Sequence, residues 1–429
     1  MFVRAGEASQ QTPGDLYRRR SAVASAPWLA NGVIYQLSVR AFGGTFDGVR
    51  ERLGYLQELG ISVIWIMPVQ PIGVAARIGE KGDPYAVRDF MAIDPELGTA
   101  DQLRALVADI HARGMRIMLD WTLNRASCDN VLTVSHPAWF MRDAGGAIYY
   151  AVPDRACFAG FDFSNRHLRA WLLKAMQDWV TGFDLDGMRF DDADITPLDF
   201  LDEIRAALVA VRPDIGLISQ STDELHHLDA CDLTYDGGAR ETMLRIAAGE
   251  ATANALRWQW EESTYTFPRG ALRMRWLEEK EQGRAFRYFG PALHLAAAAV
   301  VLTLDGVPHL MMGQEFNEPR WQDWRSLFDD FRLDWDSFDQ STFKHYQALI
   351  KLRRAHAALR QGAVHFVRSG VPQLLVYWRS NADARLLVAV NLADTACALP
   401  AAFEAQQMLY AHGVRGQTLA PFGCAIAKA

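Results

Sequence analysis

The residues best suited to chemistry lie in the segment DLDGMRFDDAD, residues 184–194. Arg189 and Asp191 are two positions apart, so on an extended strand both side chains point to the same face. A cation beside a carboxylate favours the ionised form and lowers its pKa, which suits a nucleophile. The same spacing also fits a structural ion pair, and the spacing taken alone favours that second interpretation.

Short apolar runs that alternate with amphipathic segments, from about residue 33 to about residue 310, would position this pair. The runs that predict strands are VIYQLSV, SVIWIMP, RIMLDW, DLDGMRF, IGLIS, DLTYD, LRMRWL and VPHLMM. Several are β-branched or continuously apolar, as strands covered on both faces must be. Eight strand–helix alternations predict a (β/α)8 barrel, in which chemistry collects at the C-terminal ends of the strands.

Helical spacing is clear in two of the intervening segments. In DQLRALVADIHARG the apolar residues form one face, and Thr99 with Gln102 predicts a capping box. In RHLRAWLLKAMQDWVTG the apolar residues also recur at helical spacing, and we expect Gly182 to end that helix.

Two further segments depart from the strand–helix alternation. An irregular stretch of about 124–163, rich in aromatic and turn residues, predicts an inserted subdomain after the third strand. QLLVYWR and RLLVAVNL are strands without an intervening helix, so residues 362–429 are expected to form a small antiparallel β domain. Residues 1–361, with the insert, would then form the barrel domain.

Composition excludes several classes of protein. The net charge of −7 provides no basic surface for nucleic acid. Five scattered cysteines without CxxC spacing argue against a disulfide framework or a zinc site. The first twenty residues, MFVRAGEASQQTPGDLYRRR, contain no apolar signal segment, and no later run reaches membrane-spanning length. We expect a cytoplasmic protein without metal or cofactor.

Several segments, in this order and spacing, resemble the α-amylase family, glycoside hydrolase family 13. They are GVIYQLSVRAF, LGYLQELGISVIWIMPVQP, DPYAVRDFMAIDPELGT, GMRIMLDWTLNRAS, FDLDGMRFD, DLTYD and LTLDGVPHLMMGQEF. The resemblance covers nearly the whole chain. It implies the barrel fold and a small-molecule carbohydrate, an α-glucoside or oligosaccharide, as the binding partner.

The resemblance also implies a retaining mechanism, in which a carboxylate attacks the anomeric carbon and a nearby carboxylic acid protonates the leaving oxygen. Carried over by position, Asp191 is the nucleophile and Arg189 its partner. Asp120 is a structural carboxylate beneath the site, and Tyr85 is the aromatic platform for the sugar ring. An ordinary core tyrosine is the weaker interpretation of Tyr85.

The chain departs from the family pattern at the residues that do the chemistry. Gln220 stands where the family has its acid glutamate, and an amide has no proton to deliver. Lys280 replaces a histidine, and Glu281 replaces an aspartate. Arg125 replaces a second histidine. These changes make Asp191, Gln220 and Glu281 the candidate catalytic positions and Tyr85, Arg125, Arg189 and Lys280 the candidate substrate-binding positions.

Further differences follow the nucleophile and bear on the missing acid. Asp194 and Ile195 stand where many relatives carry Lys and His, which argues against a standard starch subsite. The calcium site of many relatives is not expected either. If Gln220 is native, either another acid must serve or the substrate must have a leaving group that needs no proton. Glu281, Asp223 and Glu224 are acids close in sequence to the expected site, although Asp223 and Glu224 each also fit solvated loop residues.

Three pairs of alternatives remain open from the sequence. Gln220 is either an introduced replacement or one of several natural departures, and Arg125, Lys280 and Glu281 favour divergence. Arg125 and Lys280 either receive an anionic sugar or pair with neighbouring carboxylates. The chain is either a hydrolase or transglycosylase of α-glycosides, or a carbohydrate-binding protein that does not catalyse.

Overall fold

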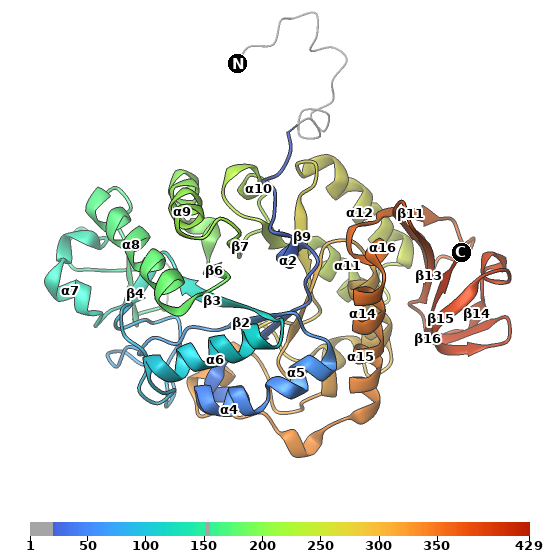
Figure 1. Ribbon diagram of the computed structural model, residues 1–429, viewed down its shortest axis with the longest axis horizontal. Helices are drawn as coiled ribbons and strands as arrows, with labels where there is room; N and C mark the ends of the chain where they lie inside the picture. Colours follow the sequence, from blue (N-terminus) through green and yellow to red (C-terminus); the bar gives the residue numbers. More distant parts are fainter. Residues whose placement is uncertain (1–19, 151–154) are drawn as a thin grey trace, which may run out of the picture.

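A computed structural model describes residues 20–150 and 155–429, and in it eight parallel strands close into a barrel (Figure 1). The strands pair in the order β1-β10-β9-β8-β7-β6-β3-β2. Their bounds are β1 Ile34–Leu37, β2 Val63–Ile66, β3 Arg116–Thr122, β6 Gly187–Asp191, β7 Gly216–Ser219, β8 Leu233–Tyr235, β9 Leu272–Arg275 and β10 Val307–Met311. The predicted barrel is therefore confirmed.

Helices cover the outside of the barrel (Figure 1). Those between the strands are α3 Val39–Gly43, α4 Phe46–Glu51, α5 Leu53–Leu59, α6 Ala100–Ala112, α8 Arg166–Phe183, α9 Leu198–Val211, α10 His226–Asp229, α11 Gly237–Ala247, α12 Ala253–Thr266, α13 Ala285–Phe289 and α14 Leu293–Thr303. After the last strand come α15 Gln340–Ala355 and α16 Ala357–Gln361.

Large apolar side chains fill the barrel interior. The cluster consists of Ile34, Val63, Trp65, Met118, Ile218, Leu233, Tyr235, Met274, Trp276 and Val307. Leu29 of the short helix α2, Pro27–Ala30, joins this cluster from below the first strand. Since α2 closes the N-terminal end of the barrel, the polar residues of the interior gather toward the opposite end.

The start of α6 and the end of α8 can be compared with the helix boundaries predicted from the sequence. Thr99 and Gln102 form the predicted capping box at the start of α6. Gly182 does not end α8, because the helix continues to Phe183 and ends at Asp184 in a left-handed conformation with φ 52°. Aspartate tolerates this conformation better than most residues, so Asp184 takes the role that was expected of glycine.

The insert after β3 is a small antiparallel unit. It contains β4 Arg125–Ser127, α7 Val131–Ser135 and β5 Phe158–Gly160, and β4 pairs with β5. Residues 151–154 of the predicted insert, and residues 1–19 with their lack of an apolar segment, lie outside the described residues.

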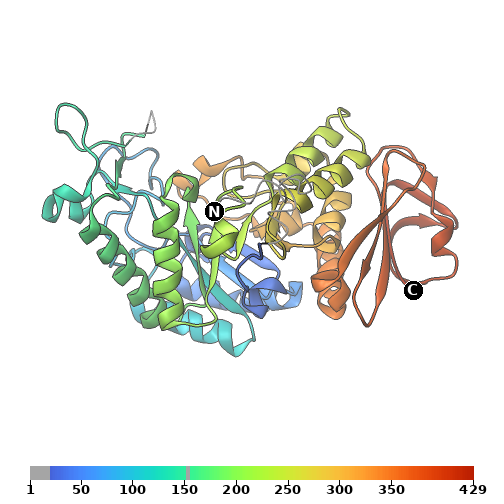
Figure 2. The same cartoon turned by 90° about the horizontal axis from the view of Figure 1, so that it is seen from above.

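The chain ends in an antiparallel sheet. Its strands are β11 Ala363–Val367, β12 Leu374–Ser380, β13 Arg385–Asn391, β14 Cys397–Ala398, β15 Gln407–Arg415 and β16 Thr418–Lys428. They pair in the order β11-β12-β13-β16-β14, with β15 also on β16. This sheet and the insert lie at opposite ends of the molecule (Figure 2). Each helix within residues 20–150 and 155–429 is too short or too polar to span a bilayer.

Glu315 is a buried carboxyl group directly after β10, in the turn Gln314–Phe316. Its Oε1 accepts hydrogen bonds from the hydroxyls of Tyr35, at 2.8 Å, and Tyr55. Its Oε2 is buried and has no hydrogen-bond partner among residues 20–150 and 155–429. Burial raises the pKa of Glu315 from 4.5 to about 7, although both tyrosine hydrogen bonds oppose the shift.

We expect Glu315→Gln to flatten the pH dependence of stability above pH 5. The folded protein holds the Glu315 proton more tightly than the unfolded chain, so wild-type stability is full below pH 4.5 and falls as pH rises toward 7. The loss corresponds to about 3 kcal/mol for this group. Denaturant unfolding at pH 5 and pH 8 measures it, with Glu58→Gln on the surface as the control. Equal pH slopes in wild type and Glu315→Gln would contradict this account.

Candidate active site

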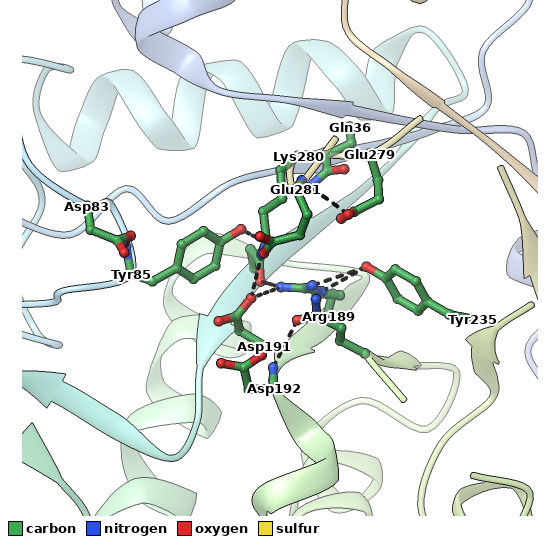
Figure 3. Close-up of polar contacts among 12 residues, drawn as sticks. Gln36, Asp83, Tyr85, Arg189, Asp191, Asp192, Tyr235, Glu279, Lys280 and Glu281 are labelled. Carbon is green, nitrogen blue, oxygen red and sulfur yellow. Dashed lines mark hydrogen bonds and ion pairs between the residues drawn. The ribbon is translucent and has the colours of Figure 1, made fainter. Parts of the chain in front are cut away.

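Five of the residues singled out from the sequence, Tyr85, Arg189, Asp191, Lys280 and Glu281, lie close together at the C-terminal end of the barrel (Figure 3). Asp191 is the last residue of β6, and Gln220 directly follows β7. Lys280 and Glu281 lie in the loop after β9. Parallel pairing sets Asp191 beside Thr122 of β3, so each of these strands delivers its terminal side chain to one region.

Three cations surround the carboxylate of Asp191. Its Oδ1 is 2.6 Å from Arg189 Nη1 and 3.1 Å from Lys280 Nζ. Its Oδ2 is 2.5 Å from Arg125 Nη2. Burial alone would raise the pKa of Asp191, but Lys280, Arg189 and Arg125 outweigh it and hold the pKa well below its usual range. Asp191 is therefore a stable carboxylate at every pH at which the protein would work.

Arg189 joins the nucleophile position to the barrel interior. It is fully buried, and its Nη1 is 2.8 Å from Asp120 Oδ1. Its Nε and Nη2 donate to the Tyr235 hydroxyl at 3.2 and 3.1 Å. The guanidinium also lies 5.0 Å from the ring centre of Trp65. Arg189 thus bridges two buried carboxylates, Asp120 and Asp191. Its geometry fits both a structural ion pair and a cation beside a candidate nucleophile.

Asp120 lies beneath the site, as expected of a structural carboxylate. Its Oδ2 accepts from the Tyr85 hydroxyl at 2.7 Å and from Trp65 Nε1 at 3.2 Å. Burial raises the pKa of Asp120, while Arg189 opposes the shift. These contacts orient the Tyr85 ring and the Arg189 guanidinium.

Tyr85, the expected sugar platform, carries a cation on its ring. Lys280 Nζ lies 4.4 Å from the ring centre, and the Tyr85 side chain is almost fully buried. Lys280 also pairs with Glu281. The ammonium therefore lies over the face of the Tyr85 ring in a cation–π contact.

The amide oxygen of Gln220 is held by the backbone of the neighbouring strand end. Gln220 Oε1 accepts from the backbone N of Asp192 at 2.9 Å. The amide NH2 remains free to face the pocket, and it can only donate a hydrogen bond. Gln220 has no proton to transfer as an acid.

Arg125 reaches the site from the insert. As the first residue of β4, it is 2.6 Å from Asp192 Oδ2 in addition to its contact with Asp191. Its guanidinium lies 4.6 Å from the ring centre of Phe158 in β5. The pairing β4–β5 therefore holds Arg125 over the nucleophile position.

A pocket of about 180 Å³ opens above these residues. It is lined by Asp83, Pro84, Tyr85, Arg125, Tyr150, Arg155, Phe158, Asp192, Gln220, Lys280, Glu281, Trp324, Leu327 and Phe328. Asp191 is 1% exposed and lies behind this lining, so Arg125 and Lys280 stand between it and the pocket. The lining carries three cationic and three acidic side chains, which leaves no excess of positive charge.

Sequence reasoning did not identify several residues of this wall. Arg155 Nη1 is 3.6 Å from Asp83 Oδ2, and its guanidinium lies 4.3 Å from the Trp324 ring centre. Burial raises the pKa of Asp83 to about 6. Asp83 precedes Tyr85 in the quoted DPY segment and could have been found there. Trp324 begins the short 3-10 helix Trp324–Phe328 after β10, a segment too short to give a periodic signal in the sequence.

Glu279 is a second residue that the sequence did not single out. Burial raises its pKa to about 7, with Lys280 lowering and Glu281 raising it. Its Oε1 accepts from Glu281 N at 3.1 Å, and its Oε2 is buried without a partner. Glu279 therefore titrates near neutral pH, and it lies beside Lys280 and Glu281 without lining the pocket (Figure 3).

The candidate replacement acids differ in position. Within residues 20–150 and 155–429, Glu281 lines the pocket, whereas Asp223 and Glu224 do not. Asp194 and Ile195 lie in the turn Ala193–Ile195, also outside the lining, and Ile195 is largely exposed. The described part of the chain also contains no cluster of three or more His, Cys, Asp or Glu side chains placed to hold a metal ion.

Comparison with known proteins agrees with this architecture. Residues 15–135 match the family model of the α-amylase catalytic domain. The chain is 26% identical to α-amylase MalA of Haloarcula japonica, over 95% of this chain and 63% of the relative. It is 24% identical to a cyclomaltodextrinase of Geobacillus thermopakistaniensis, over 85% of this chain and 65% of that relative. The chain thus spans less than two thirds of these relatives.

A solved structure extends the match to the whole fold. The maltogenic α-amylase AmyB of Thermotoga neapolitana superimposes with a TM-score of 0.82 and 28% identity, over 94% of this chain and 97% of the other. The common barrel, with its insert after the third strand and its C-terminal β domain, matches the motif order in the sequence. The chain is thus similar, over nearly its whole length, to maltogenic amylases and cyclomaltodextrinases of the α-amylase family, glycoside hydrolase family 13.

Proposed function

We propose that the chain is an α-amylase-type glycoside hydrolase or transglycosylase that acts on α-glucans or cyclodextrins. The observation that carries the proposal is the ionised Asp191 at the end of β6, held between Arg189, Arg125 and Lys280. A non-catalytic site has no chemical need for an ionised carboxylate at the position of the family nucleophile.

In the proposed reaction Asp191 attacks the anomeric carbon while the bond from that carbon to the leaving oxygen breaks. Water, or the hydroxyl of a second sugar, then displaces Asp191 and gives its proton to solvent. Gln220 donates a hydrogen bond to the leaving oxygen but no proton. The first step is therefore fast only for a leaving group that departs as a stable anion, unless another acid such as Glu281 supplies the proton.

The two cations in front of Asp191 must move before a sugar can reach it. Arg125 has a second partner in Asp192, and Lys280 has one in Glu281. Both of these acids are nearer to solvent, with side chains 44% and 40% exposed. We propose that each cation turns toward its outer partner when substrate enters, so that neither loses all of its charge compensation.

These ion pairs also bear on the charge of the substrate. Arg125 and Lys280 are each paired with two carboxylates, which supports the ion-pair interpretation over recognition of an anionic sugar. We therefore propose a neutral α-glucan as the substrate.

A second candidate function is carbohydrate binding without catalysis. Two observations favour it: the amide at position 220, and the Lys280 ammonium over the Tyr85 ring. In that case the pocket holds an α-glucan in contact with its aromatic wall, and Asp191 serves only to anchor the cations.

We expect wild-type protein to cleave 4-nitrophenyl α-glucoside but to cleave maltotriose far more slowly, because nitrophenolate needs no proton to leave. Release of nitrophenol and of glucose measures the two reactions. Asp191→Asn should abolish both, since an amide is not a comparable nucleophile.

Two outcomes separate the candidate functions. Binding of maltotriose by calorimetry without release of nitrophenol would reject the hydrolase and support the binding protein. Release of nitrophenol that survives Asp191→Asn would show that Asp191 is not the nucleophile.

A further inference from the structure

Two arginines lie on the outer face of strand β9, far from the pocket described above. Leu272 and Met274 point into the barrel interior, so the alternating residues Arg273 and Arg275 point outward toward the helices. Strands covered on both faces are normally apolar on both, and a buried charge there requires a partner.

Only one of these two arginines has an ionic partner. Arg275 pairs with Asp236 and, at 2.7 Å, with Asp305. Arg273 has no ion pair or side-chain hydrogen bond among the described residues, and its Nη1 is buried without a partner. The residue is 7% exposed, and its guanidinium lies 5.1 Å from the ring centre of Phe267.

Arg273 lines a groove of about 580 Å³. The groove is bounded by the end of α12, the start of β9, Gly306 before β10, and Arg360 in α16. It therefore opens at the N-terminal ends of the strands, opposite to the candidate active site. Arg269 and Arg360 contribute further positive charge, while Trp260 and Phe267 contribute aromatic surface.

Positive charge exceeds negative charge around this groove. Burial would raise the pKa of Asp305, but Arg275, Arg273 and Arg379 overcome this effect and lower it to about 2. Arg379 and Arg353 are buried nearby and donate to backbone carbonyls, such as Thr303 O and Leu304 O. The single carboxylate of Asp305 thus faces several guanidinium groups.

We propose that this groove is a binding site for a small organic phosphate. Arg273 binds the phosphoryl oxygens, with Arg269 and Arg360 at the rim, and Trp260 and Phe267 contact the organic part of the ligand. Guanidinium groups match phosphate oxygens in pairs. Together the three guanidinium groups offer more N–H donors than the two oxygens of a carboxylate can accept. A phosphoryl group has more acceptor oxygens, so the groove favours a phosphate over a carboxylate.

Titration calorimetry on the full chain with phenyl phosphate tests the site, with inorganic phosphate and benzoate as comparison ligands. We expect phenyl phosphate to bind more tightly than either. Arg273→Met should weaken phenyl phosphate at least about tenfold. Without ligand this variant should unfold at the wild-type temperature or higher, because the buried Arg273 Nη1 has no partner in the part of the chain that the structure describes.

The matched control is Arg155→Met, which removes a guanidinium from the candidate active pocket and should leave phosphate binding unchanged. If Arg273→Met fails to fold, Arg269→Gln at the exposed rim should still weaken phenyl phosphate about threefold. Failure of wild type to bind at millimolar phenyl phosphate would overturn the proposal. So would equal binding of benzoate, or loss of binding in Arg155→Met with full binding in either groove variant.

Discussion

Gln220→Glu is expected to raise kcat on maltotriose by about 10²–10⁴-fold, the usual contribution of a general acid. Glutamate has nearly the same shape as glutamine, and the 2.9 Å hydrogen bond from Asp192 N to Oε1 can persist in the variant. The new carboxyl group would supply the proton that the amide lacks. With 4-nitrophenyl α-glucoside, which needs no proton, the rate should change little.

The pH profile of the variant gives a second test of this prediction. The new group must be protonated to act, so activity on maltotriose should fall as pH rises through its pKa. The wild-type protein should not show this fall in activity with rising pH. Gln57→Glu, an exposed position on α5, is the matched control and should leave both activities unchanged.

The two possible outcomes bear directly on the function. A gain on maltotriose alone would show that loss of the acid limits the natural chain. If kcat on maltotriose does not rise although maltotriose still binds, Lys280 and Arg125 prevent turnover. That result would support carbohydrate binding without catalysis.

Arg189→Met is expected to lower the free energy of unfolding by about 3–5 kcal/mol, the cost of removing one partner from a buried ion pair. Arg189 is the ionic partner of Asp120, and both side chains are fully buried. Asp191 keeps Arg125 and Lys280, so the larger part of the cost should come from Asp120. Denaturant unfolding monitored by circular dichroism measures the change.

A double-mutant cycle assigns that cost. Asp120→Asn combined with Arg189→Met should recover part of the lost stability, because no unpaired carboxylate then remains at position 120. Arg104→Met on α6, whose partner Asp101 is exposed, is the control and should cost about 1 kcal/mol or less. A loss of similar size in Arg189→Met and Arg104→Met would contradict the central role of the buried pair.

Much of the fold follows from the sequence because periodicity is a local property. Apolar runs such as SVIWIMP and IGLIS predict strands, and their order predicts a barrel with its chemistry at the strand ends. The same logic located Asp191, Gln220 and Glu281 at strand ends that meet in one region, whereas Lys280 was identified only through the resemblance to the α-amylase family. It failed for Gly182, because either Gly182 or Asp184 could adopt the left-handed conformation that ends α8.

The pairing of charges was decided only by the tertiary structure. The sequence left open whether Arg125 and Lys280 face a ligand or a carboxylate. The structure pairs both with Asp191 and covers the Tyr85 ring with Lys280. It also shows Glu279 buried next to Lys280, and a buried Arg273 Nη1 in the distant groove that has no partner among the described residues. The sequence by itself determined which faces are buried, whereas charge partners depend on how far side chains from separate loops reach, and only the folded chain sets those distances.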